Sequence, residues 1–233
     1  MVATTSTTPT PARGLGSSPK AKALIHIVAT SLELRKPTDP DLAELVDVVR
    51  AGIHDPQTMP FTTAWTDAES PELERRVLKY WWRCRSEFTP QQWDLPFVVV
   101  SEGTIVGVQS LAASNFPTLR TAETGSWLGL DHQGAGIGKE MRRAIVSFAF
   151  ECLDALAVTS AAYMDNRASQ QVSLATGYEP NGTVFEERRG ERAEQIRYIL
   201  TRQRWSELQT NAEIHIEGME ACRDMFGLAN PLG

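Results

Sequence analysis

Residues 121–153 join an alternating strand, a glycine-rich turn and a strongly apolar helix, and this succession restricts the fold more than any other part of the chain. In the turn, glycine recurs at every second position, at Gly134, Gly136 and Gly138. The helix that follows carries an apolar stripe made of Met141, Ile145, Phe148 and Cys152. A helix with such a face packs on a sheet. The segment therefore predicts a strand and a helix packed on each other, with an exposed glycine turn between them.

The order of the surrounding elements predicts a single mixed α/β domain. The expected order is a strand at 31–38, helices at 39–53 and 71–88, strands at 95–100, 104–113 and 121–130, a helix at 139–156, a strand at 157–164, a helix at 166–178 and a hairpin at 183–202. Short turns make consecutive strands antiparallel, whereas a strand–helix–strand unit needs a crossover. We therefore expect a mixed, mostly antiparallel sheet flanked by helices.

The two ends of the chain are expected to lie outside this domain, which spans residues 31–205. Residues 1–30 are rich in Thr, Ser, Pro and Gly and bury too little apolar surface to offset the entropy lost on ordering. We expect a flexible tail there, in which "ALIHIVA" could be a short ordered stretch. Residues 206–233 are expected to form a C-terminal extension with a short strand around Ile214 and Ile216.

Composition excludes several classes of partner. The formal net charge of -6 argues against nucleic acid, because phosphate contacts need a basic face. The three cysteines are far apart and show neither metal-ligand spacing nor a disulfide framework, which suits a reducing cytoplasm and predicts no metal site. No apolar run approaches the roughly 20 residues that cross a bilayer, so we expect no membrane association.

The glycine turn itself favours an anion site. A P-loop would need Ser or Thr after the lysine, where Glu140 stands, and a dinucleotide fingerprint would need G-x-G-x-x-G early in a repeating βαβ unit. Both alternatives fail. Glycines still allow backbone N–H groups to approach a ligand at a positively polarised helix start. Lys139, Arg142 and Arg143 are disfavoured there unless an anion binds. The alternative interpretation is a plain turn with a solvated basic face.

The motifs around this turn resemble the GNAT superfamily of acyltransferases. Gln133 to Gly138 is similar to its Q-x-x-G-x-G acyl-CoA loop, and "AETGSWLGLDHQGAGIG" resembles the RimJ/RimL type, which modifies N-termini of ribosomal proteins. Downstream, Asn166, Ser169, Val172 and Gly177-Tyr178 match that type's N-x-x-S-x-x-V…G-[FY] helix. "GSWLGL", "GYEPNG" and "CRDMFG" further resemble an actinobacterial subgroup with succinyl-CoA transferase-like members.

The resemblance implies a set of donor-binding residues. The loop amides would hold the CoA pyrophosphate, the cations would reach its phosphates, and the strand around Leu128 would pair with the pantetheine arm and offer an oxyanion donor. Asn166 would hydrogen-bond the pantetheine, although it could equally be a helix cap. The implied cofactor-binding residues are Leu128, Leu130, Gln133, Gly134, Ala135, Gly136, Ile137, Gly138, Lys139, Arg142, Asn166 and Ser169.

The resemblance also implies the catalytic groups. Glu123 matches the carboxylate of the A-E-x-G-Y-W segment, and alternation along a strand places it on the face of Trp127. Partly buried beside the donor, it would accept the amine proton, if it is not simply an exposed strand glutamate. Ser169 would protonate the leaving thiolate or donate a hydrogen bond to it, with Tyr178 and Ser173 as alternatives.

The acceptor side is less determined. The first two helices and their loop would form its wall, with His54, Met59, Phe61, Trp65, Tyr80, Trp81 and Trp82 as candidates for either a pocket or ordinary packing. The expected activity is CoA-dependent N-acyl transfer from acetyl-CoA to a primary amine, either a peptide or protein N-terminus or a small molecule. Transfer from succinyl-CoA, a CoA-binding sensor without turnover, and a homodimer remain open alternatives.

Overall fold

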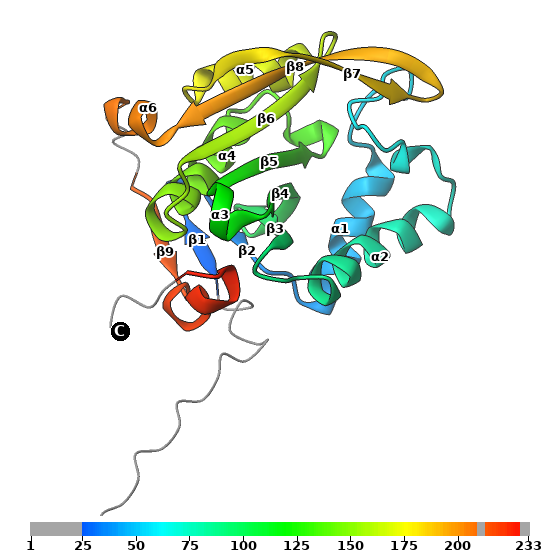
Figure 1. Cartoon of the computed structure of the whole chain (residues 1–233). Coiled ribbons are helices and arrows are strands. Elements are labelled where there is room, and N and C mark those ends of the chain that lie inside the picture. Colours follow the sequence, from blue (N-terminus) through cyan, green and yellow to red (C-terminus); the bar gives the residue numbers. More distant parts are fainter. Residues whose placement is uncertain (1–24, 209–212, 229–233) are drawn as a thin grey trace, which may run out of the picture.

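A single mixed sheet organises the chain. The computed structural model describes residues 25–208 and 213–228, and its nine strands follow the order β7-β8-β6-β5-β4-β3-β2-β1-β9 (Figure 1). Only β5 and β6 pair in parallel. The strands are β1 (His26–Val28), β2 (Leu32–Arg35), β3 (Gln92–Ser101), β4 (Thr104–Ser114), β5 (Thr121–Leu128), β6 (Ala157–Tyr163), β7 (Glu179–Arg188), β8 (Glu191–Thr201) and β9 (His215–Glu217). The expected mixed, mostly antiparallel α/β fold is confirmed.

Helices cover both faces of this sheet. The α-helices are α1 (Asp39–Ala51), α2 (Glu72–Ser86), α3 (Phe116–Leu119), α4 (Ile137–Ser147), α5 (Arg167–Ala175) and α6 (Arg202–Glu207). The 3₁₀-helices are η2 (Trp65–Asp67), η3 (Leu130–His132) and η5 (Glu220–Phe226), and η4 (Phe148–Cys152) is a π-helix. Helices α1 and α2 pack on one face of the sheet and α4 on the other. This arrangement divides the apolar interior into two layers.

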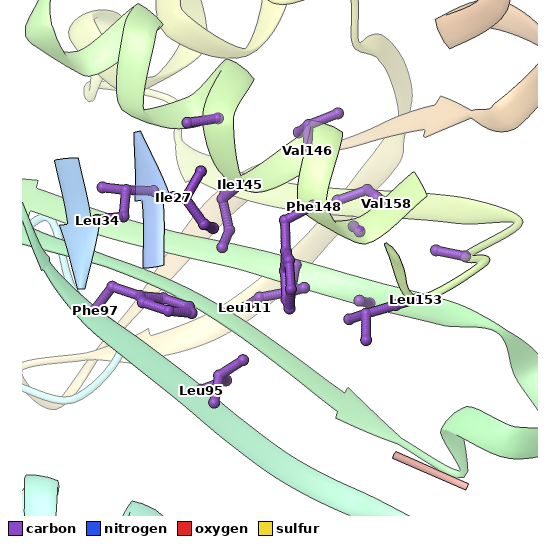
Figure 2. Close-up of a cluster of buried hydrophobic side chains, with 14 of the residues drawn as sticks. Ile27, Leu34, Leu95, Phe97, Leu111, Ile145, Val146, Phe148, Leu153 and Val158 are labelled. Carbon is purple, nitrogen blue, oxygen red and sulfur yellow. The ribbon is translucent and has the colours of Figure 1, made fainter. Parts of the chain in front are cut away.

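Alternation along β3 explains the two layers. Leu95 and Phe97 belong to the larger core beneath α4, whereas Val98 and Val100 belong to the smaller core beneath α1 and α2. In the larger core, the rings of Phe97 and Phe148 meet edge to face with centroids 6.2 Å apart (Figure 2). Because both faces of β3 are buried, its sequence is a nearly continuous apolar run.

A capping network fixes the start of α1. The side chain of Thr38 accepts a hydrogen bond from the Asp41 N–H, and Asp41 in turn accepts from the Thr38 N–H at 2.7 Å. The two terminal nitrogens of Arg35 also donate to the Asp41 carboxylate, at 2.6 and 2.8 Å. Hydrogen bonding from Arg35 is the main reason why the pKa of Asp41 lies well below its usual value. The network links β2 to α1.

Both ends of the sheet differ from the sequence-based boundaries. Within the expected tail of residues 1–30, the stretch "ALIHIVA" that could be ordered contains β1, residues 26–28, and Ile27 is fully buried between β2 and β9. Residues 1–24 lie outside the described part of the chain. The short strand expected around Ile214 and Ile216 is β9, at the edge of the sheet.

The C-terminal segment belongs to the main core. Cys222 and Phe226 are fully buried, and the Phe226 ring contacts those of Trp93 and Phe88, with centroids 5.3 and 5.2 Å away. The expectation that residues 206–233 form an extension outside the domain is therefore wrong for η5, which fills the end of the larger core. The segment is too short for a repeating apolar pattern to reveal this burial from sequence.

No helix within residues 25–208 or 213–228 has the length and apolarity to cross a membrane.

The Asp41 network makes stability depend on pH. We expect Asp41→Asn to lower the free energy of unfolding at pH 7 by about 2 kcal/mol, the scale of hydrogen bonds to a charged group. Because the folded-state pKa of Asp41 is depressed, its contribution is complete above the unfolded-state pKa and is lost as the pH falls through the folded-state value. The difference between wild type and variant should therefore be constant from about pH 7 to 5 and shrink below about pH 4.

Urea unfolding at each pH measures this difference. Asp39→Asn, at an exposed carboxylate on the same helix, should change stability by about 0.5 kcal/mol or less. A difference between wild type and Asp41→Asn that stays constant down to about pH 3 would contradict the assigned network.

Candidate functional site

Strands β5 and β6 separate after a short parallel contact. They pair at only three positions, the last being Glu123 with Thr159. Farther along, β5 pairs with β4 and β6 with β8, so within the described residues a split opens between β5 and β6. The Thr124 hydroxyl donates to the carbonyl of Thr159 at 3.1 Å and closes the vertex of the split. Backbone groups that a continuous sheet would pair are thereby available to a ligand.

The glycine loop lies just beyond the end of β5, at the open end of the split. Gly134 and Gly136 have φ of 78° and 90°, which glycine adopts without strain. A Cβ at Gly138 would lie 3.3 Å from Val172, so glycine there allows α4 to approach α5 closely. Among the hydrogen bonds of the described chain, none uses the N–H groups of residues 134–138. The loop therefore presents an uncapped helix start suited to an anion.

Two residues predicted to bind the cofactor instead hold the base of the loop. The Gln133 side-chain amide donates to the carbonyls of Ile53 and Leu128, each at 2.9 Å, and its backbone N–H donates to Leu130. The Leu130 N–H is used by Gly52 at 3.0 Å. The expected ligand amides of Gln133 and Leu130 are therefore already bonded, and these residues position the loop. The predicted cradle is reduced to residues 134–138, which include Ala135 and Ile137.

A cavity of about 310 Å³ adjoins the loop, and its wall includes Ala135, Gly136, Lys139 and Arg143. Lys139 and Arg143 are both exposed. Thr30, beside β1, and Ile214, beside β9, form part of the opposite wall. Glu140 fixes that wall by accepting hydrogen bonds from the Ser31 N–H and hydroxyl, each at 2.6 Å. Two cations thus lie where a phosphate-bearing ligand held by the loop could extend.

Arg142, in contrast, points into the protein. It is only 2% exposed, and its guanidinium donates to Ser126 and Ser160, each at 3.1 Å, and to Ser173 at 3.5 Å. Burial lowers the pKa of this guanidinium from its usual value. The expectation that Arg142 contacts CoA phosphates is therefore wrong: position 142 falls on the sheet-facing side of α4, whereas positions 139 and 143 face solvent.

Tyr178 extends the same buried polar cluster. Its hydroxyl lies 3.2 Å from that of Thr124, and the Arg142 guanidinium carbon lies 5.9 Å from its ring centre. Burial is the main reason why the pKa of Tyr178 is raised, so the phenol stays protonated at neutral pH. The cluster of Arg142, Tyr178, Ser126, Ser160 and Ser173 is called the arginine–serine cluster below.

Helix α5 borders the split from the side of β6. Asn166 caps it, accepting a hydrogen bond from the Ser169 N–H at 3.1 Å. A cap uses only the side-chain oxygen, so the amide NH₂ group remains a donor toward a ligand. Ser169 is half-buried and lies one turn before Ser173, on the same side of α5. Asn166 and Ser169 therefore lie on the α5 side of the split, and their contacts with the donor stay a prediction.

Glu123 lies at the vertex of the split but is exposed. It is opposite Ala112 on β4 and Thr159 on β6, and it shares the α1–α2 face with Trp127. The predicted shared face is thus observed, and Glu123 is exposed on it, as in the alternative interpretation of an exposed strand glutamate. Asp94 on β3 is opposite Ala112, so Asp94, Ala112 and Glu123 lie side by side across three strands. Asp94 accepts a hydrogen bond from Tyr80 at 2.8 Å. Burial raises the pKa of Asp94.

Aromatic side chains form a wall beside Glu123. The ring centroids of Phe61 and Trp65 are 5.4 Å apart, and those of Trp65 and Trp127 are 6.1 Å apart. His54 touches the Phe61 ring and bonds to the Thr66 hydroxyl. The other residues predicted for the acceptor wall differ in exposure. Met59 and Trp81 are buried in the protein, whereas Trp82 is 56% exposed.

The β7–β8 hairpin closes over the α1–α2 loop (Figure 1). Arg189 at its tip donates to the Asp67 carboxylate from Nε at 2.8 Å and to the Pro56 carbonyl at 3.1 Å. Gln195 on β8 also reaches Thr62 at 3.3 Å. The two segments, far apart in sequence, are therefore held against each other.

Comparison with protein families decides the relationship of this chain. The acetyltransferase (GNAT) domain matches residues 31–179, more than half of the sequence. The protein is a GNAT acyltransferase. The family match covers the loop, the split and the motif helix, whereas β8, β9 and η5 lie beyond it.

Solved GNAT structures share the fold. A ribosomal L7/L12 α-N-protein acetyltransferase, RimL, in complex with coenzyme A superposes with a TM-score of 0.62 and 20% identity, covering 75% of this chain and 96% of RimL. Mycobacterium smegmatis RimJ with a CoA-disulfide gives a TM-score of 0.65 and 17% identity, covering 84% and 92%. The microcin C7 self-immunity acetyltransferase MccE, with acetyl-CoA and AMP, gives 0.57 and 17%, covering 73% and 92%.

The sequence offered only a partial signal for the arginine–serine cluster. Ser173 and Tyr178 were candidates from the motif, but Ser126, Ser160 and an inward Arg142 were not expected together. They come from β5, β6, α4 and α5, which no local pattern brings together. In the described part of this GNAT acyltransferase, no three His, Cys, Asp or Glu side chains gather as metal ligands.

The loop glycines give a stability prediction. Nothing lies within 4 Å of a Cβ placed on Gly136, so Gly136→Ala meets no clash and pays only for its positive φ, about 1–2 kcal/mol. Gly136→Asn should cost less, because asparagine tolerates the left-handed region. Urea unfolding measures both values. Equal stability of wild type and the alanine variant would mean that the loop does not hold this conformation in solution.

Proposed function

We propose that this GNAT acyltransferase transfers an acyl group, by default acetyl, from acyl-CoA to a primary amine. The observation that carries the proposal is the split between β5 and β6. It has an amide-lined loop at its open end and an exposed carboxylate at its vertex. These are the two requirements of a ternary reaction: a place to hold a phosphorylated donor and a base beside the reacting carbon.

The donor would lie along the split. The N–H groups of residues 134–138 would face a pyrophosphate at the start of α4, and Lys139 and Arg143 would extend the positive charge into the adjoining cavity. The pantetheine arm would follow β5 toward Glu123, with the backbone at Leu128 and the Asn166 amide as partners. RimL, RimJ and MccE are each described with CoA or a CoA derivative, which supports this class of donor.

The amine would approach from the α1–α2 face. Its nitrogen attacks the thioester carbon, Glu123 takes its proton, and collapse of the tetrahedral intermediate breaks the carbon–sulfur bond so that CoA leaves as the thiolate. Ser169, half-buried in the first turn of α5, would donate a hydrogen bond on the donor side. Direct attack of this kind needs no nucleophilic serine or cysteine in the protein.

The acceptor we favour is the α-amine of a peptide or protein. The aromatic wall of Phe61, Trp65 and Trp127, bounded by the hairpin at Arg189, gives an extended chain an apolar surface beside Glu123. Similarity to RimL and RimJ supports the same class. Small amines, succinyl-CoA as donor, and a sensor that binds CoA without turnover are outcomes that a panel of donors and amines distinguishes.

Donor binding is tested first. We expect calorimetry to show one acetyl-CoA site per chain, and Lys139→Ala to weaken binding by about tenfold at low salt, with a smaller effect at high salt because exposed charges are screened. Lys79→Ala, at an exposed lysine on α2, is the matched control and should leave the affinity unchanged. Absence of binding to wild type would overturn the proposal.

The base is tested separately. We expect Glu123→Gln to lower kcat by about 100-fold while the dissociation constant of acetyl-CoA stays within about twofold, because the amide cannot accept the proton. Release of free thiol, followed with panels of peptides and small amines, measures turnover. Glu220→Gln, the same change at an exposed glutamate in η5, is the control. Full turnover of Glu123→Gln would remove Glu123 from the mechanism.

A further inference from the structure

Arg142 carries a buried positive charge that no carboxylate compensates. Within the described chain its guanidinium, 2% exposed, donates to neutral serine hydroxyls and lies beside the neutral Tyr178 phenol, while its Nε has no hydrogen-bond partner. No Asp or Glu of the described chain forms an ion pair with it. Burying a charge costs several kcal/mol unless an opposite charge is supplied. The site is therefore suited to an anion that is not part of the resting protein.

On the α4 side of the sheet, the Arg142 guanidinium bridges β5 and β6. Ser126 belongs to β5, Ser160 to β6 and Ser173 to α5, so that Arg142 on α4 joins both edges of the opening. Farther along α4 and η4, Ile145 and Phe148 belong to the larger apolar core (Figure 2). Among the buried residues of α4, Arg142 is the charged one, and its serine partners place it where β5 and β6 part.

The serine hydroxyls connect the Arg142 guanidinium to the split by hydrogen bonds. A serine oxygen that accepts from Arg142 still has its own O–H group to donate. Ser126 is half-buried, unlike Ser160 and Ser173, so its hydroxyl is the member of the cluster with access to a ligand in the split. Hydrogen bonding to the cation polarises that hydroxyl and strengthens its donation to an anion.

The base and this cation lie on opposite faces of the sheet. Glu123 and Trp127 face α1 and α2, whereas Thr124 and Ser126 alternate toward α4. An acyl group at the vertex would therefore meet the amine on one face and the arginine–serine cluster on the other. This separation keeps the proton acceptor away from the positive charge and places that charge where the leaving group departs.

We propose that Arg142, acting through Ser126, is a positioning residue that stabilises the CoA thiolate as it leaves. The inference rests on the proposed acyl-CoA chemistry. When the carbon–nitrogen bond has formed, the carbonyl is restored, the carbon–sulfur bond breaks and its electron pair stays on sulfur. The amine proton goes to Glu123. Arg142 keeps its protons, Ser126 donates a hydrogen bond to the sulfur, and the thiolate later takes a proton from water.

The test is the ionisation of the CoA thiol while it is bound. Free CoA is added to saturation, and the ultraviolet absorbance of its thiolate is recorded against pH. We expect the bound thiol of the wild-type complex to ionise about one pH unit or more below that of the Arg142→Met complex, because the buried cation favours the charged form. Among the described residues, Tyr178 lies beside Arg142 and Glu123 lies across the sheet, and both side chains are titratable; Tyr178→Phe removes the phenol's own absorbance change.

Activity and stability supply the second readout. We expect Arg142→Met and Ser126→Ala to lower kcat by about 100-fold or less without a matching rise in KM, as when one preorganised donor is removed. Arg142→Lys should recover part of kcat. Arg142→Met should unfold at a temperature no lower than that of wild type, because methionine removes a buried charge and leaves no charged partner behind.

Matched outcomes separate this inference from the proposed function. Arg143→Met, an exposed cation next in sequence, should leave the pH of thiol ionisation unchanged even if it weakens CoA binding. If wild type binds no CoA, the proposed function itself fails. If CoA binds and turns over but wild type and Arg142→Met ionise the thiol at the same pH, only the role of Arg142 is overturned. Loss of kcat only in proportion to a loss of thermal stability would also assign Arg142 a structural role.

Discussion

The site depends on one interruption of backbone hydrogen bonding, the separation of β5 from β6 beyond Glu123 and Thr159. A continuous sheet would use every backbone group of β5 internally and would leave no place for an extended ligand. The separation is stable because each strand keeps a partner on its other side, β4 for β5 and β8 for β6. Polar side chains from both strands meet Arg142 beneath the opening.

In the proposed reaction, one face of the sheet would serve the acyl donor and the other face the amine. On the α4 side, an uncapped helix start and a buried cation are arranged for a donor that carries phosphate and releases a thiolate. On the α1–α2 side, Glu123 and an aromatic wall surround the place where an amine would approach. Glu123 and Ser126, three residues apart on one strand, reach these opposite environments because strand side chains alternate.

Local patterns predicted the features that depend on neighbours in sequence. The α5 cap at Asn166, the shared face of Glu123 and Trp127, and the exposed glycine turn all follow from spacing and residue type. Predictions failed where a residue's partner is remote. The Gln133 amide is taken by Ile53, and η5, expected outside the domain, fills the end of a core whose strands are remote in sequence. Motif spacing carries no information about such partners.

Sequence by itself predicted the mixed α/β fold, and its motifs indicated the GNAT relationship, an anion site at the loop and a candidate base, because motif spacing, periodicity and glycine placement act within a few residues. Tertiary structure decided which of three neighbouring cations faces solvent. Lys139 and Arg143 line the cavity, whereas Arg142 is enclosed by serines from β5, β6 and α5. The chain must be folded before these serines meet, and only then does the low dielectric of the interior give the charge on Arg142 its strength.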